Sequence, residues 1–135
     1  MKQKDAVKAY MAASNLNMQV LSDGRTARKI FNLVRTLKPI WEFQSQEENK
    51  ICTEHPDVNP ANMTIALKEG LDKEDAIKEL DDMQEKFRKL GNMEIEVDFT
   101  KFTIDLGMEN IRISGKEIGD LEPFIDFTDG AEDHG

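Results

Sequence analysis

The chain has 135 residues, a net charge of −9, 39% hydrophobic residues and 33% charged residues. This is the usual size of one domain and the composition of a folded protein with a strongly solvated surface. The single cysteine, Cys52, excludes an intrachain disulfide and favours a reducing compartment. No stretch approaches the roughly 18 apolar residues of a membrane helix, and the N-terminus lacks the apolar core of a signal peptide. We therefore predict a cytoplasmic protein without a membrane partner.

The charge is unevenly distributed along the chain. Residues 1–41 carry eight Lys or Arg and two Asp, which gives +6, whereas residues 42–135 carry ten basic and 25 acidic residues, which gives −15. The overall sign disfavours nucleic acid as a partner, and a local basic surface favours an acidic protein.

Three helices are expected in the first two thirds of the chain. Residues 3–13 have helical spacing, and from Arg25 to about Thr53 apolar residues recur in steps of three and four. Pro39 predicts a kink near residues 35–38 or a break there. Beyond Phe43 the apolar stripe thins, so residues 42–53 are predicted to face solvent or another chain.

The segment 54–70 contains Pro56 and Pro60 and ends the long helix. Asp72 is a good N-cap for a second long helix over 72–90, which Gly91 ends. We expect the two long helices to form an antiparallel hairpin.

The last third changes period. Residues 93–99 alternate between apolar and acidic, which predicts a half-buried strand, and residues 102–106 and 111–113 continue the strand pattern. Ser114 and Glu117 form a capping box for a short helix that Pro123 limits.

The predicted fold is therefore α+β. It consists of the antiparallel hairpin of two long helices, a short N-terminal helix, a small two- or three-stranded antiparallel sheet and a short C-terminal helix. Residues 1–127 form one domain, and 128–135 form a disordered acidic tail. The predicted core comprises Ile30, Val34, Leu37, Trp41, Ile77, Leu80, Met83, Phe87, Ile95, Val97, Phe99 and Leu121.

Catalysis and metal binding find little support in the sequence. Cys52 and His55 are close together, but the end of a helix disfavours a thiolate. A metal site from these two residues and Asp57 lacks a second ligand pair at zinc-like spacing. Ser-Gly-Lys at 114–116 lacks the remainder of a phosphate-binding loop. We predict no catalytic, cofactor-binding or metal-binding residue, and no enzyme.

Charged residues of the hairpin are the predicted protein-binding residues. Its basic end would lie beside Lys86, Arg88 and Lys89, so like charges would gather there. We expect this positive charge to be neutralised within the chain by Glu94, Glu96, Asp98 and Asp105. Neutralisation by a second protein is the alternative. The predicted binding residues are Arg25, Arg28, Lys29, Arg35, Lys38, Glu47 and Glu48.

Three stretches carry a resemblance: RTARKIFNLVRTLKPIWEFQSQEENKI, DAIKELDDMQEKFRKLGNMEIEVDF and ISGKEIGDLEPFI. Together they resemble a family of small uncharacterised proteins from phages and prophages of Gram-positive bacteria. The resemblance covers residues 3 to 125, and we expect the chain to differ from the family most in the segment 54–70. It implies a phage context and supplies no catalytic motif.

These observations predict a non-enzymatic phage or prophage protein that acts through protein–protein contacts, in virion assembly or as an accessory to it. The alternative is a phage-encoded inhibitor of a host enzyme or anti-phage defence complex that acts through an acidic surface. The expected partners are a phage or host protein or a second copy of the chain, and the expected location is the host cytoplasm or the virion.

Overall fold

The structure is a computed structural model in which residues 1–66 and 70–129 are described, and its fold is α+β. The elements in chain order are α1 (Gln3–Asn17), α2 (Gly24–Glu54), β1 (Val58–Asn59), β2 (Thr64–Ile65), α3 (Lys73–Gly91), β3 (Phe102–Asp105), α4 (Gly115–Leu121) and β4 (Ile125–Thr128). None of the described helices is long and apolar enough to span a bilayer.

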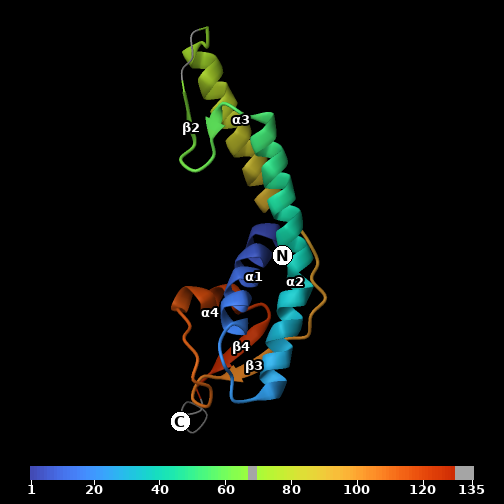
Figure 1. The fold of residues 1–135 in the computed structure, drawn as a ribbon. Helices are drawn as coiled ribbons and strands as arrows, with labels where there is room; N and C mark the ends of the chain where they lie inside the picture. Colours follow the sequence, from blue (N-terminus) through green and yellow to red (C-terminus); the bar gives the residue numbers. More distant parts are fainter. Residues whose placement is uncertain (67–69, 130–135) are drawn as a thin grey trace.

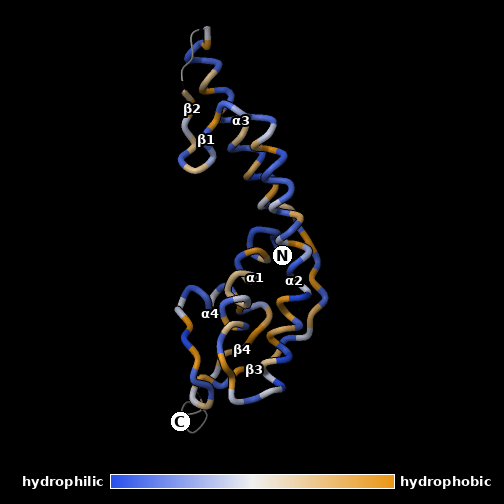
Figure 2. The backbone as a smooth tube through the Cα atoms, viewed as in Figure 1, coloured by the Kyte–Doolittle hydropathy of each residue, from blue (hydrophilic) through white to orange (hydrophobic). Residues whose placement is uncertain are grey.

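The molecule is elongated, with two regions joined by α2 (Figure 1). We call residues 1–44 and 92–129 the body, and residues 45–66 and 70–91 the arm. The first half of α2 packs on α1 in the body, and its second half packs on α3 in the arm. Polar and apolar residues alternate along α2 and α3, as expected for helices with one buried face (Figure 2).

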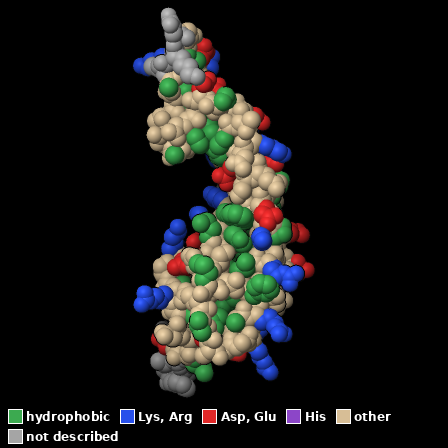
Figure 3. Space-filling view, viewed as in Figure 1, with side chains coloured by type: hydrophobic (Ala, Val, Ile, Leu, Met, Phe, Trp, Pro, Cys, Tyr) green, Lys and Arg blue, Asp and Glu red, His purple; other side chains and the backbone are tan. Residues whose placement is uncertain are grey.

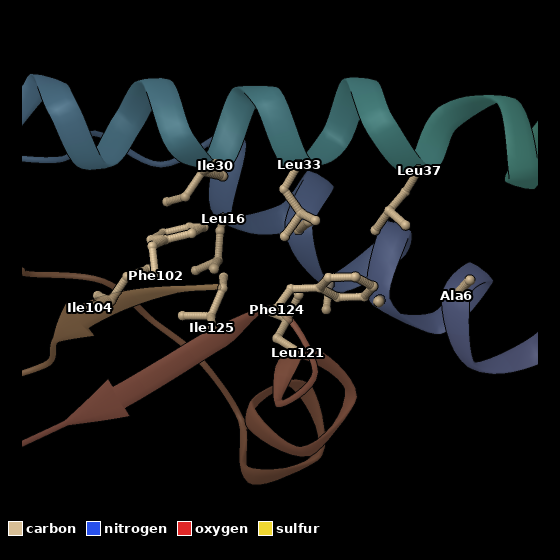
Figure 4. Close-up of a cluster of buried hydrophobic side chains, with 13 residues drawn as sticks. Ala6, Leu16, Ile30, Leu33, Leu37, Phe102, Ile104, Leu121, Phe124 and Ile125 are labelled. Carbon is tan, nitrogen blue, oxygen red and sulfur yellow. The ribbon is translucent and has the colours of Figure 1, made fainter. Parts of the chain in front are cut away.

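The core of the body lies between α1, α2 and the β3–β4 sheet (Figure 4). The buried face of α1 is mostly alanine, which lets α2 approach closely. Into this contact α2 inserts Ile30, Leu33 and Leu37, all without exposed surface. The core is closed from the other side by Phe102 and Ile104 of β3, Leu121 of α4, Phe124 of the following turn and Ile125 of β4.

The sheet of the body is parallel, which corrects the antiparallel prediction. Phe102 of β3 pairs with Ile125 of β4, and Asp105 pairs with Thr128. The chain leaves β3, crosses through α4 and returns to the same end of the sheet, so the next strand runs in the same direction. An antiparallel pair of strands does exist, but it is the short β1–β2 hairpin of the arm, within the segment 54–70 that was predicted to end the long helix.

Two other predicted strands do not form. Residues 93–99 are extended and half-buried at every second position, so the alternation correctly predicted which side chains face inward. Their described long-range backbone bonds go to the N-terminus: Gln3 N donates to Met93 O at 2.8 Å, and Ile95 N donates to Met1 O at 2.9 Å. Residues 111–113 are also not a strand. Alternation of apolar and polar residues indicates an extended chain with one buried side. A strand also requires a neighbouring strand with which its backbone can form hydrogen bonds.

The antiparallel hairpin of long helices is confirmed in part. In the arm, Lys86 of α3 contacts Glu54 at the end of α2, and α3 runs back from there to Gly91, where it reaches the start of α1. Thus α3 pairs only with the second half of α2, because α1 occupies the first half.

Pro39 does not break α2. The helix is continuous from Gly24 to Glu54, and Pro39 lies on its exposed face. The carbonyl of Arg35, which loses its helical donor, therefore faces water, which can satisfy it.

The core prediction is correct for Ile30, Leu37, Met83 and Leu121 and wrong for Ile77, whose exposed fraction is 49%. Ile77 lies on α3 where that helix extends beyond the end of α2, so none of the described elements covers it. The remaining predicted core residues are partly buried. Of the predicted tail, Thr128 belongs to β4, and residues 130–135 lie outside the described residues.

Candidate functional site: a basic stripe on α2

The candidate site is a row of cations along the outer face of α2. We call Arg25, Arg28, Lys29, Arg35 and Lys38 the basic stripe; all five are exposed. In Figure 3, Lys and Arg side chains follow the lower part of α2 along the right edge of the molecule. From Arg25 to Lys38, 13 residues at a helical rise of 1.5 Å per residue span about 20 Å.

The rotation of α2 about its axis is fixed from the opposite side. Because Ile30, Leu33 and Leu37 are buried in the body core, the residues on the opposite side of the helix, such as Arg28 and Arg35, must point outward. The start of the helix is also fixed: the Asp23 carboxylate accepts hydrogen bonds from Arg25 N at 3.0 Å and Thr26 Oγ1 at 3.0 Å. These two bonds lower the pKa of Asp23, the Arg25 backbone bond having the larger effect. The first turn of the stripe is therefore well ordered.

A buried carboxylate holds the loop that precedes the stripe. Glu109, only 9% exposed, accepts from Ser22 N at 2.9 Å and from Asp23 N at 3.2 Å. Glu109 was not among the predicted residues, because nothing local in the sequence distinguishes it from the other acidic residues of the C-terminal half.

Two adjoining hollows border the stripe. One, of about 580 Å³, lies over the first turns of α2 and is lined by Asp23, Gly24, Arg25, Arg28, Lys29 and Asn32. The other, of about 360 Å³, lies between α2 and the segment 98–102 and shares Lys29 and Asn32. Lys29 Nζ is 5.8 Å from the centre of the Phe102 ring, within range of a cation–π contact. Asn32 was missed, although its position seven residues after Arg25 places it on the same helical face.

Of the carboxylates that were expected to cover the stripe, Asp98 lies beside it and Glu94 does not. Glu94 is 3.4 Å from the N-terminal ammonium, and Asp98 lines the second hollow without forming an ion pair with Lys29. Within residues 1–66 and 70–129, Arg25, Arg28, Lys29 and Arg35 make no ion pair. Lys38 makes a long one, 3.9 Å, with Glu42 one turn further along α2.

The other expected neighbours of the basic end are also elsewhere. Lys86 pairs with Glu54 in the arm at 2.8 Å, and Arg88 pairs with Glu85 on α3 at 2.6 Å. Like charges therefore do not gather at one end of a hairpin, because α3 never reaches the stripe. The stripe is instead isolated on the body.

Glu47 and Glu48 do not belong to the same surface. They are half-buried and lie on the arm, where Glu47 pairs with Lys50 at 3.0 Å. At the rise of a helix they are about 14 Å beyond Lys38. The predicted binding residues are thus split between two regions of the molecule.

An apolar residue interrupts the stripe. Phe31 lies between Arg28 and Arg35 and is 48% exposed, and the Arg35 guanidinium is 5.7 Å from the centre of its ring. An exposed aromatic ring between arginines is a combination that is enriched at protein interfaces. Each hollow also contains one carboxylate, Asp23 in the first and Asp98 in the second, but cations outnumber carboxylates in both, which suits the binding of acidic groups.

The Cys52–His55 pair lies in the arm. His55 is 5% exposed, its Nδ1 is 2.6 Å from Glu79 Oε1, and its Nε2 is 3.0 Å from Lys86 Nζ and 3.3 Å from Asp82 Oδ2. Since an ammonium only donates, Nε2 accepts from Lys86, and Nδ1 carries the proton that is donated to Glu79.

This arrangement joins α2 to α3. The Lys86 bond lowers the pKa of Glu54, and the Glu54 bond raises the pKa of Lys86. Both nitrogens of the His55 ring are occupied by neighbours other than Cys52, so the described geometry gives the thiol no base. The described residues also include no group of three or more His, Cys, Asp or Glu side chains placed to hold a metal ion.

Comparison of the chain with protein-family models, with curated proteins and with solved structures gives no match.

Proposed function

We propose that this chain is a non-enzymatic protein that acts by binding an acidic protein partner through the basic stripe. The observation that carries the proposal is the absence of ion pairs for Arg25, Arg28, Lys29 and Arg35 in the described part of a chain with a net charge of −9. Carboxylates are abundant in this protein, yet none of the described ion pairs joins one to these four cations.

The stripe is suited to an acidic helix or strand of a partner. Arginine presents planar donors that bind carboxylates in pairs, and Phe31 offers an apolar contact between them. A protein partner is favoured over a nucleic acid because the overall charge repels a polyanion. The resemblance to phage proteins makes virion assembly, or an accessory role in it, the process that we propose for this contact.

The experiment is a pull-down with the tagged chain from phage-infected or prophage-induced bacteria, read by mass spectrometry. The wild type is compared with Arg28→Glu/Arg35→Glu and with the matched control Lys8→Glu/Arg112→Glu, which has the same change in net charge elsewhere on the body. We expect head, tail or packaging proteins to be recovered by the wild type and the control, and to be lost with the stripe variant. Equal recovery by all three would contradict the proposal.

The arm supports a second candidate, an inhibitor that binds a basic host protein through acidic side chains. Glu74, Asp75 and Asp81 on α3 are exposed and make no ion pair with any described residue. In that case a single basic host protein is recovered in near-equal amount, its binding weakens at high salt, and the stripe variant still binds it.

A further inference from the structure

We propose that the partner of the basic stripe is the outer face of α3 of a second copy, so that the chain self-associates head to tail. We call Glu74, Ile77 and Asp81 the acidic face of α3. This inference names the partner of the proposed binding surface and therefore depends on the proposed function.

The two surfaces have the same spacing and opposite charge. Arg28, Phe31 and Arg35 stand at positions i, i+3 and i+7 of α2, and the acidic face stands at the same three positions of α3. This spacing places all three side chains on one side of a helix. Each set consists of two like charges on either side of an exposed apolar residue, Phe31 at 48% and Ile77 at 49% exposure.

The charges of both sets are available. Among the described residues, Arg28, Arg35, Glu74 and Asp81 take part in no ion pair, although neighbours such as Glu85 and Arg88 pair at 2.6 Å along the same helix. The opposite face of α3 is fixed against the rest of the arm through Ala76 and Met83, which are 3% and 0% exposed. The acidic face therefore points outward for the same reason as the stripe does.

A single chain cannot bring the two surfaces together. Glu79 of α3 lies beside His55, 27 residues after Arg28, which is about 40 Å along α2. Ile77 lies one half-turn further toward the tip of the arm. A second chain is needed to join them.

The register fits when the α3 of one copy lies parallel to the α2 of the next. Arg28 then faces Glu74, Phe31 faces Ile77, and Arg35 faces Asp81. Lys73 and Lys78 flank the acidic face, and in this parallel register they lie diagonally across from the neutral Ala27 and Asn32. The charges thus alternate across the contact without a like-charge pair.

The geometry favours an open series of copies over a closed dimer. In Figure 1, α1 and α3 lie on the same side of α2. The stripe lies opposite the buried Leu33 and Leu37 of α2, and the acidic face lies opposite the buried Met83 of α3. Each copy thus offers one surface of each kind on opposite sides. Contacts between two different surfaces produce rings or filaments.

The first test is sedimentation velocity of the full chain at several protein concentrations and two salt concentrations. We expect the mean mass to rise with concentration beyond that of a dimer, and to fall as salt increases. Removing two charge pairs with Arg28→Ala/Arg35→Ala, or with Glu74→Ala/Asp81→Ala, is expected to weaken association about tenfold. The control Lys8→Ala/Arg112→Ala should associate like the wild type, and circular dichroism should show that all variants are folded.

Mixing the variants tests the direction of assembly. An equimolar mixture of the two alanine variants retains one intact stripe and one intact acidic face, so it should form 1:1 dimers and stop there. The charge-reversed pair, Arg28→Glu/Arg35→Glu with Glu74→Arg/Asp81→Arg, should restore longer assemblies in the mixture although each variant alone is monomeric.

A wild type that remains monomeric at low salt, or one whose association ignores both pairs of substitutions, would overturn the inference. So would stripe-dependent binding of a duplex oligonucleotide by a monomeric chain. If the chain stays monomeric while the stripe still captures a phage protein in the pull-down, the self-association fails and the proposed function stands. If the stripe variant changes neither assay, both fail.

Discussion

The body and the arm are held together in different ways, although α2 runs through both. Among the described residues, thirteen buried hydrophobic side chains form the cluster of the body, and only four, Ile51, Val58, Met83 and Leu90, form that of the arm. The arm compensates with a polar contact, the His55 ring between Glu79 and Lys86. A region with few apolar contacts opens at a lower free-energy cost. We therefore expect the arm to open before the body unfolds.

The largest expected effect is that of Leu33→Ala in the body. Leu33 has no exposed surface, so its truncation leaves a cavity and should lower the free energy of unfolding by about 2–5 kcal/mol. Urea denaturation measures the loss. The exposed control Arg35→Ala should stay within about 0.5 kcal/mol of the wild type.

Met83→Ala in the arm is the matched substitution, since Met83 is equally buried. It should mainly speed amide hydrogen exchange in β1, β2 and α3 and leave α1 protected. Equal loss of protection in α1 would show that body and arm unfold as one unit, and would contradict the expectation that the arm opens first.

An intermediate effect is expected for His55→Ala. The substitution removes the ring that joins α2 to α3, while Glu79 and Lys86 remain partly exposed and can be solvated. We expect a loss of about 1–3 kcal/mol, seen as faster hydrogen exchange in the arm. The control Cys52→Ala should have the smaller effect, because the half-buried thiol makes no contact with the His55 ring that the structure describes. A larger effect for Cys52→Ala would assign the arm's stability to packing instead.

The smallest effect is expected at the capping box of α4 in the body. Ser114 Oγ accepts from Glu117 N at 3.1 Å, and the Glu117 carboxylate accepts from Ser114 N at 3.2 Å. Ser114→Ala should cost about 1 kcal/mol in thermal or urea unfolding.

The stabilisation by this capping box is also expected to depend on pH. The backbone bond from Ser114 lowers the pKa of Glu117. A carboxyl whose pKa is lowered by folding stabilises the protein above its ordinary pKa, and this contribution is lost as the pH falls through the lowered value. Glu117→Gln should therefore be less sensitive to acid than the wild type. Identical acid unfolding curves would remove Glu117 from this role.

Much of the fold was predictable because its signals are local. The spacing of Ile30 and Leu37 identified the buried face of α2, Asp72 capped α3, and the Ser114–Glu117 capping box formed as expected. The α+β class follows from these elements and from the alternation near Phe102. Arg25 and Arg28, which were predicted to bind a protein, are exposed on α2, and their role in binding stays a prediction.

The pairings between distant segments were not predictable. The alternation of residues 93–99 is the same whether an extended chain lies beside a strand or beside the N-terminus, as it does here. The direction of β4 depends on the crossover through α4, which no local pattern records. The buried state of Glu109 depends on the loop before α2 reaching it from 86 and 87 residues away.

The sequence by itself determined where the helices begin, which of their faces are apolar and where the cations lie, because helical period and capping act over a few residues. Two features are seen in the tertiary structure alone: α1 packs on the first half of α2, and α3 packs on the second half. As a result, the basic stripe has no described ion pair apart from the long Lys38–Glu42 contact. This packing depends on which long-range contacts bury the most apolar surface. Because α2 buries its apolar face against α1, its arginines point toward solvent.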